Sequence, residues 1–261
     1  LLVAVFPYGI KGAAFATGIS QLTTTSMLFY YILFKTKRVK FTKIKYSFLE
    51  LIKISKVGFA EFLAEVSTGI AIFVFNLVIL KSLGEKGVSA FGVIGYISSF
   101  VVMTMIGFSQ GIQPIVSFNL GAKKYDNVIK TLKISLIMII ITGTVFYGGI
   151  NLFADKIIHT FLNDPDTFSL TKYALVIYSF AYIINGLNIV TAGYFTAIKK
   201  VDISTLITVL RGVILIVAFL YLLPKYLGND GIWWTVPIAE LLTLILSTYY
   251  IRKYSLQYSR A

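Results

Sequence analysis

Apolar residues run in long stretches along this chain, and polar and charged residues collect in the short connectors between them. Each stretch is close to the roughly 20 residues that an α-helix needs to cross the hydrocarbon core of a membrane. None of them alternates polar and apolar residues as a strand of an outer-membrane barrel would. The pattern therefore predicts an all-α integral membrane protein. We expect seven transmembrane helices, at residues 13–34, 57–80, 91–118, 134–154, 173–198, 203–223 and 232–251.

The overall composition agrees with this pattern. Hydrophobic residues make up 57% of the 261 residues and charged residues 13%, and the mean hydropathy is +0.83. A soluble domain carries about a quarter charged residues, so the apolar excess indicates a lipid environment. The absence of cysteine excludes disulfides and thiolate metal sites. The single histidine, His159, has no further histidine or carboxylate cluster at a ligand spacing, so we expect neither a metal site nor an enzyme.

Two segments of the chain resemble each other. Residues 9–32 align with residues 228–251 without a gap, at a constant offset of 219 residues. The identical pairs are Gly9/Gly228, Gly12/Gly231, Ile19/Ile238, Leu22/Leu241, Thr24/Thr243, Tyr30/Tyr249, Tyr31/Tyr250 and Ile32/Ile251. The match predicts an internal duplication, in which the last helix of one repeat is followed by a whole second repeat. The alternative is that two apolar helices share the same small set of residue types.

Basic residues are distributed unequally between the two sets of connectors. Seventeen Lys and Arg residues lie at 35–56, 123–133, 199–200 and 252–260, whereas six lie in the connectors on the opposite side. The positive-inside rule places the richer side in the cytoplasm, with the amino terminus outside and the carboxyl terminus inside. The repeated helices then run in the same direction, as in transporters with parallel repeats. We expect a multi-pass protein of the cell membrane.

The net charge of +13 does not indicate a nucleic-acid partner. The basic residues lie in short flanks of membrane helices and lack interleaved aromatic stacking platforms. Anionic headgroups are the expected neighbours of the longest basic connector, at residues 35–56. Membrane lipid is therefore the expected partner.

The region from Gly107 to Val128, GFSQGIQPIVSFNLGAKKYDNV, combines a Gly/Gln/Pro-rich helix end with an Asn-x-Gly-Ala loop. It resembles the signature region of the multidrug and toxic compound extrusion (MATE) transporters. Further parts agree in order, and together they cover nearly the whole chain: Gly-x-x-Gly-Ala-Ala at Gly9, FLNDPD at Phe161, Thr-Ala-Gly at Thr191 and Gly-Ile-Trp at Gly231.

The resemblance implies a protein of two six-helix lobes that alternate access to a central cavity. Residues 1–34 would be the last helix of the amino-terminal lobe, 35–56 a basic cytoplasmic loop between the lobes, and 57–261 the carboxyl-terminal lobe. The chain would then be a fragment that lacks most of the amino-terminal lobe. The implied function is secondary active efflux of cationic or amphipathic organic compounds, coupled to Na⁺ or H⁺ entry. The alternative is a lipid-linked oligosaccharide flippase of the same superfamily.

Two carboxylates in the second apolar stretch are the main candidates for ion coupling. Glu61 and Glu65 lie one turn apart on a helix face that they share with Asn76. Partly desolvated carboxylates on one face tend to share a proton or attract a cation. Glu61 has an alternative role as an interfacial carboxylate that pairs with Lys53 or Lys56.

The family resemblance bears on this pair of carboxylates. Glu65 matches a position at which sodium-coupled members carry an acid, but their second acidic position falls here at Asn185. An amide oxygen can ligate an ion but cannot titrate. The departure puts the two-carboxylate sodium site of the family in doubt.

Other polar residues inside the apolar stretches are candidates for a substrate cavity, because such residues are costly in a membrane. Amides and phenols can bind a substrate through hydrogen bonds and cation–π contacts, although they also hold helices together. Arg211 is expected to snorkel or to pair with Glu65 or Glu240. The candidates for the cavity are Asn76, Gln110, Gln113, Tyr178, Tyr182, Asn188 and Glu240.

Overall fold

The computed structural model describes residues 9–36 and 47–258, except for the side chains of residues 9, 10, 13, 53, 56, 57, 60, 61, 64 and 255–258. Every regular element in these ranges is helical, as the sequence predicts. The chain divides into two compact units, Leu1–Ile52 and Lys53–Ala261. The elements are α1 (Gly9–Tyr30), η1 (Tyr31–Lys35), α2 (Phe48–Gly121), α3 (Tyr125–Leu152), α4 (Ala154–His159), α5 (Pro165–Ser179), α6 (Ala181–Ala197), α7 (Val201–Val209), η2 (Leu210–Ile214), α8 (Leu215–Leu227) and α9 (Asp230–Tyr258).

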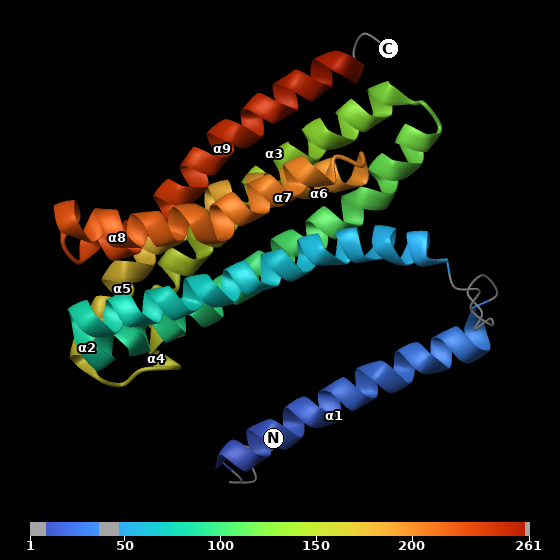
Figure 1. Ribbon diagram of the computed structural model, residues 1–261. Helices are drawn as coiled ribbons and strands as arrows, with labels where there is room; N and C mark the ends of the chain where they lie inside the picture. Colours follow the sequence, from blue (N-terminus) through green and yellow to red (C-terminus); the bar gives the residue numbers. More distant parts are fainter. Residues whose placement is uncertain (1–8, 37–46, 259–261) are drawn as a thin grey trace. The chain divides into compact units, whose positions relative to one another are not determined.

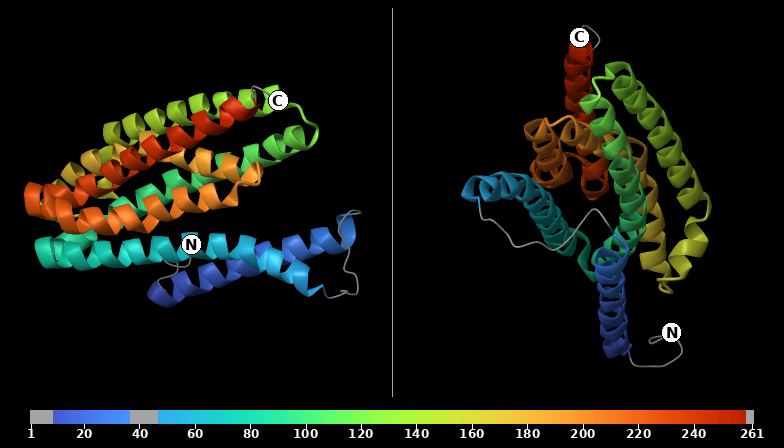
Figure 2. Two further views of the ribbon diagram at one scale, coloured as in Figure 1. Left: turned by 45° about the horizontal axis from the view of Figure 1, so that its top comes forward. Right: turned by 90° about the vertical axis from the view of Figure 1, so that its right-hand side faces the viewer.

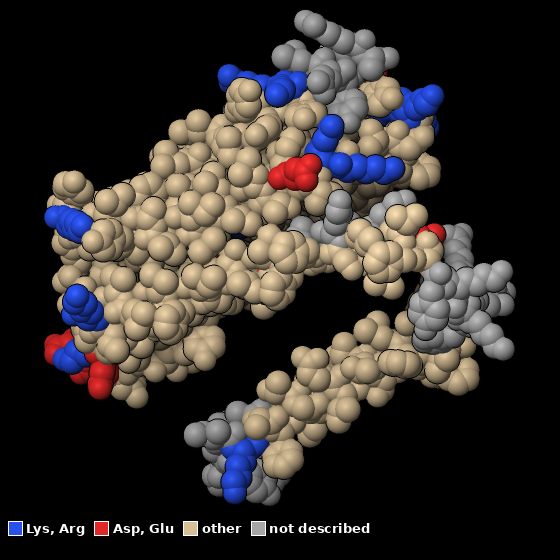
Figure 3. Space-filling view, viewed as in Figure 1, with Lys and Arg blue, Asp and Glu red and all other residues tan. Residues whose placement is uncertain are grey.

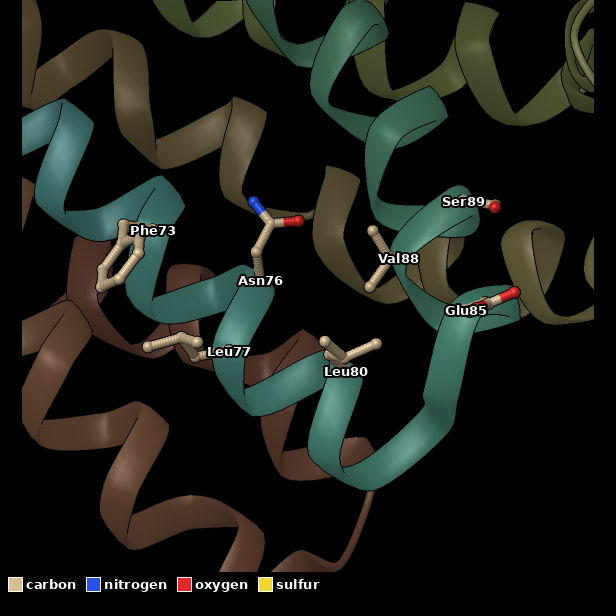
Figure 4. Close-up of a pocket in the computed structure, with 7 residues that line it drawn as sticks. All are labelled: Phe73, Asn76, Leu77, Leu80, Glu85, Val88 and Ser89. Carbon is tan, nitrogen blue, oxygen red and sulfur yellow. The ribbon is translucent and has the colours of Figure 1, made fainter.

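Helix α2 contains two of the predicted transmembrane stretches and reverses at Gly84 (Figures 1 and 4). Gly84 has φ 68° and ψ −161°, a conformation that favours glycine because it has no Cβ. This position lies inside the connector expected between the second and third stretches. The helix begins at Phe48, so the expectation of a loop over all of residues 35–56 was wrong at its carboxyl-terminal end.

Two further predicted helices depart from a regular α-helix. The stretch at 173–198 is divided into α5 and α6, which meet at a bend of 42°. The stretch at 203–223 contains the π-helical turn η2 between α7 and α8. Neither feature follows from the apolar pattern, which is equally continuous across both.

Helix α6 is the centre of the second unit. It is buried along most of its length and packs against α3, α9 and α7, in a bundle whose helices run roughly side by side (Figures 1 and 2). Helices α3 and α6 approach closely at Gly143. A Cβ atom at this glycine would lie 2.5 Å from the backbone oxygen of Tyr182, so no larger residue fits without a shift. The glycine thus sets the distance between the two backbones.

The outer surface of the second unit is largely apolar between its two ends. Large side chains such as Phe73, Phe100 and Ile245 are more than half exposed, and charged residues gather near the ends of the bundle (Figure 3). Soluble proteins rarely expose large side chains of this kind over a continuous surface, so the surface matches a lipid environment.

Length and composition identify four described helices that can cross a membrane, or five if α5 and α6 form one span. One of the four, Glu65–Gly121, includes the reversal at Gly84 and so comprises two of the predicted crossings. Helix α1 is not among these candidates. The predicted count of seven is therefore approximate, and the crossing by α1 stays a prediction.

Candidate functional site

A buried ion pair joins η2 to α9 in the interior of the second unit. The side chain of Glu240 is 4% exposed and that of Arg211 is 17% exposed. Nη2 of Arg211 donates to Oε1 of Glu240 at 2.6 Å, and Nε donates to the two carboxylate oxygens at 3.0 and 3.2 Å. The planar guanidinium fork matches a carboxylate in this bidentate manner. Of the two partners expected for Arg211, the structure shows Glu240.

Asn188 on α6 extends this pair into a network of three helices. Its Nδ2 donates to Oε2 of Glu240 at 2.7 Å and to the backbone oxygen of Glu240 at 2.9 Å. Its Oδ1 accepts a hydrogen bond of 2.9 Å from the hydroxyl of Ser247 on α9. Asn188 and Ser247 are fully buried. A buried charge is tolerated when it is paired and its remaining lone pairs are bonded, and both conditions hold here.

Arg211 lies in a π-helical turn, and such turns occur often at functional positions. The next residue, Gly212, faces α2, because a Cβ atom placed on it would lie 3.4 Å from Cβ of the buried Ser67. The turn therefore connects the ion pair to the helix that carries Glu65.

The tyrosines of α5 and α6 lie beside this network. The hydroxyls of Tyr182 and Ser98 are 2.7 Å apart and buried, which joins α6 to α2. The rings of Tyr178 and Tyr182 meet edge to face, with centroids 6.5 Å apart. Asn185, one turn after Tyr182, is 7% exposed, and its Oδ1 has no hydrogen-bond partner within residues 9–36 and 47–258. This amide oxygen is thus free to accept a donor or to ligate a cation.

Glu65 is in a different setting from Glu240. It is exposed on α2, and no ion pair or hydrogen bond joins its carboxylate to another described side chain. Glu61 belongs to the same helix, but its side chain lies outside the described residues. No described hydrogen bond or ion pair joins Glu65 to Asn185, so a single cluster of the coupling residues stays a prediction.

Asn76 lines a pocket of about 300 Å³ between the two arms of α2 (Figure 4). Its Nδ2 donates to the backbone oxygen of Ile72 at 2.9 Å. The remaining walls are largely apolar, with Phe73, Leu77 and Leu80 on the first arm, and Glu85 adds a carboxylate at the turn. Sequence reasoning did not single out Glu85, because it lies in a connector.

The other predicted cavity residues take three kinds of position. Gln110 is exposed on α2, whereas Gln113 is half-buried beside Gly193 of α6. Tyr182, Asn188 and Glu240 are buried. Asn188 bonds directly to Glu240 and Tyr182 bonds to Ser98, and none of the three lines the pocket at Asn76. Their role as substrate contacts stays a prediction.

Sequence reasoning missed the part played by Ser247. A signal for it was present, because Glu240, Thr243 and Ser247 recur at a helical spacing on one face of α9. All three are buried. A polar stripe in an otherwise apolar membrane helix marks the face that packs against other helices.

Comparison with known proteins identifies relatives across the chain. The model of the MatE family matches residues 61–222. The multidrug export protein MepA of Staphylococcus saprophyticus is 25% identical over 246 residues, which is 92% of this chain and 53% of that protein. The chain thus spans about half the length of the curated relatives it matches.

Solved structures agree in fold. An outward-facing MATE transporter of the MOP superfamily aligns with a TM-score of 0.87 at 20% identity, over 100% of this chain and 59% of that one. An inward-facing structure aligns with a TM-score of 0.82 at 20% identity, over 100% and 61%. The same fold is therefore found in structures of both conformations.

Proposed function

This chain belongs to the MatE family, and from that premise we propose that it acts in secondary active efflux, exporting cationic or amphipathic organic compounds in exchange for Na⁺ or H⁺. Membership of a transporter family confirms the expectation that the chain is not an enzyme. The apolar surface and the membrane-length helices support a place in the cell membrane. The proposed orientation, with the amino terminus outside and the carboxyl terminus in the cytoplasm, rests on the bias in basic residues.

The observation that carries the coupling proposal is the contrast between two carboxylates. Glu240 is held by Arg211 and Asn188, whereas Glu65 has no partner in the described part of the chain. An ionisable residue in a membrane helix is costly and is retained mainly where it has a function. We propose that Glu65 takes up and releases the coupling ion. Asn185 fits a supporting part, since its unbonded amide oxygen offers a neutral ligand.

Asn76 and its pocket support an amphipathic substrate. Apolar walls with one amide and one carboxylate suit a molecule with an apolar body and a positive end. In the proposed arrangement, this lobe acts together with a second six-helix lobe, as the family resemblance implies.

An efflux assay tests the function and the coupling residue separately. Ethidium efflux by the intact protein would be measured in membrane vesicles with a Na⁺ or a H⁺ gradient imposed alone. We expect efflux under at least one gradient, and at least a tenfold loss in the Glu65→Gln variant. Glu50→Gln is the matched control, because Glu50 is an exposed carboxylate in the first turn of the same helix.

Each component of the proposal has its own contrary outcome. Wild-type vesicles that do not move ethidium under either gradient would contradict the antiporter. Unchanged efflux in Glu65→Gln would contradict the coupling role while leaving the antiporter in place. The gradient that drives efflux identifies the ion.

The flippase alternative gains no support. A lipid diphosphate needs free basic residues within the membrane, and Arg211 is already engaged by Glu240. No other Lys or Arg lies in the interior of the predicted stretches of this sequence.

A further inference from the structure

A second pocket, of about 480 Å³, is lined by residues of the second arm of α2, the end of α3 and the short helix α4, and by none of the ion-pair network. Figure 1 labels these three helices. The volume of the pocket falls in the range of about 300–1,000 Å³ that is typical of small-molecule sites. The walls are almost entirely apolar. Several of the lining side chains, among them Tyr96, Phe100 and Val145, are exposed, so the pocket opens on the outer surface of the unit.

Aromatic rings form the walls of this pocket. Tyr96 and Phe161 stack with centroids 6.0 Å apart and planes 9° apart. Phe100 and Phe146 meet edge to face at 5.9 Å. Gly149 contributes no side chain to the wall, and a Cβ atom placed on it would meet no other atom within 4 Å. The aromatic pairs and the glycine together leave an apolar groove with room for a chain-like ligand.

A basic residue without an acidic partner flanks the groove. Lys156 is exposed on α4, directly before the groove-lining Ile157. The nearest acid in sequence, Asp155, is engaged by Lys172 at 2.7 Å. Within the described ranges no salt bridge involves Lys156.

Two further acids, in the connector after α4, are also engaged. Lys86 pairs with Asp166 at 2.6 Å and with Asp164 at 3.9 Å. The positive charge of Lys156 is therefore left for a ligand. Lysine commonly places its charge at headgroup level while its stem lies along apolar surface.

We propose that this groove binds an anionic phospholipid of the membrane leaflet next to α4. One acyl chain lies between the aromatic walls over Gly149, and the phosphate pairs with Lys156. The charge selects an anionic headgroup over a zwitterionic one, because a basic residue near the surface attracts anionic lipid. The site is separate from the proposed ion and substrate residues, so it holds whether or not Glu65 couples transport.

Native mass spectrometry of the intact protein in detergent tests the site, with equal amounts of dioleoyl phosphatidylglycerol and dioleoyl phosphatidylcholine as probes. We expect phosphatidylglycerol to be retained about five times more than phosphatidylcholine, a factor that corresponds to one basic residue near an anionic headgroup. Gly149→Leu fills the groove and should reduce retention of both lipids at least fivefold. Lys156→Gln should bring the two lipids to equal retention.

Gly148→Leu is the matched control, because Gly148 is adjacent, exposed and absent from the groove, and a Cβ atom there also meets no atom within 4 Å. This variant should retain lipid like the wild type. Lys156→Gln keeps the test valid if Gly149→Leu does not fold, since an exposed lysine without a salt bridge supports no packing. Equal retention of the two lipids by the wild type, or undiminished retention in a folded Gly149→Leu protein, would overturn the proposal.

Discussion

The buried pair of Arg211 and Glu240 gives a stability prediction whose size follows from its geometry. Replacing Glu240 by Gln removes the negative charge but keeps the shape of the side chain. Arg211, 17% exposed, then has no counter-charge in the network. In addition, glutamine carries an NH₂ group where glutamate has a second oxygen. This NH₂ group would face either Asn188 Nδ2 or Arg211, and both of these are hydrogen-bond donors too.

Removing one partner of a buried ion pair costs about 3–5 kcal/mol, because an uncompensated charge remains. At roughly 2–4 °C per kcal/mol for a chain of this size, we expect the unfolding midpoint to fall by about 10 °C. Arg211→Met should have a similar effect, since it leaves the carboxylate unpaired. Replacing both residues by Met removes both charges, and well-packed apolar replacements of a buried pair are often neutral or stabilising. The double variant should therefore be more stable than either single variant.

Thermal unfolding of the purified protein in detergent, followed by the loss of its monodisperse peak, measures these differences. Glu85→Gln is the control, because Glu85 is exposed and makes no salt bridge within the described residues, so its midpoint should not change. Two results would refute the reasoning. One is a Glu240→Gln protein as stable as the wild type, and the other is a double variant whose loss equals the sum of the two single losses.

Two further predictions concern helix packing and pH. Gly143→Leu should destabilise the protein by more than Gly148→Leu in the same unfolding assay, because only the first places atoms against the Tyr182 backbone. The Thr167 hydroxyl and then its backbone N–H donate to Asp164 and hold the pKa of that carboxyl below its ordinary value of 3.8. Asp164 is thus the ionised N-cap of α5, and its contribution to stability is present above pH 4 and is lost as the pH falls through the lowered pKa. An asparagine at this position still caps the helix but does not titrate. Asp164→Asn should therefore reduce the fall of the unfolding midpoint between pH 5 and 3. An unchanged slope would contradict this assignment.

Much of the fold follows from the sequence, because hydrocarbon forces each long apolar stretch to satisfy its own backbone as a helix. The reversal at Gly84 falls in a predicted connector. The start of α2 at Phe48 was missed, because Glu50 and the lysines after it were interpreted as a loop. No proline or glycine lies at the bend after Ser179, so the sequence does not predict it.

The site was less predictable than the fold, because its residues come from helices whose facing sides the sequence does not fix. Arg211 had two possible partners in the sequence, and only the packing of η2 against α9 distinguishes them. Asn188 was predicted to line the substrate cavity, yet its amide donates a hydrogen bond to the carboxylate of Glu240. Spacing along the sequence alone does not distinguish polar residues that hydrogen-bond to one another across helices from polar residues that face a cavity.

Glu240 and Glu65 also differ in what a change of charge would cost, and this difference supports the proposal that Glu65 is the coupling residue. Protonating Glu240 would break its charge pairing with Arg211, at the cost of about 3–5 kcal/mol given above for an unpaired buried charge. An ion gradient would have to supply that amount in every cycle before any substrate moved. Glu65 is exposed, and no described side chain pairs with it, so gaining or losing a proton or Na⁺ there breaks no internal contact. The network around Glu240 then holds α6, η2 and α9 together, while the charge that changes during the proposed cycle lies on an α2 side chain that pairs with no described residue.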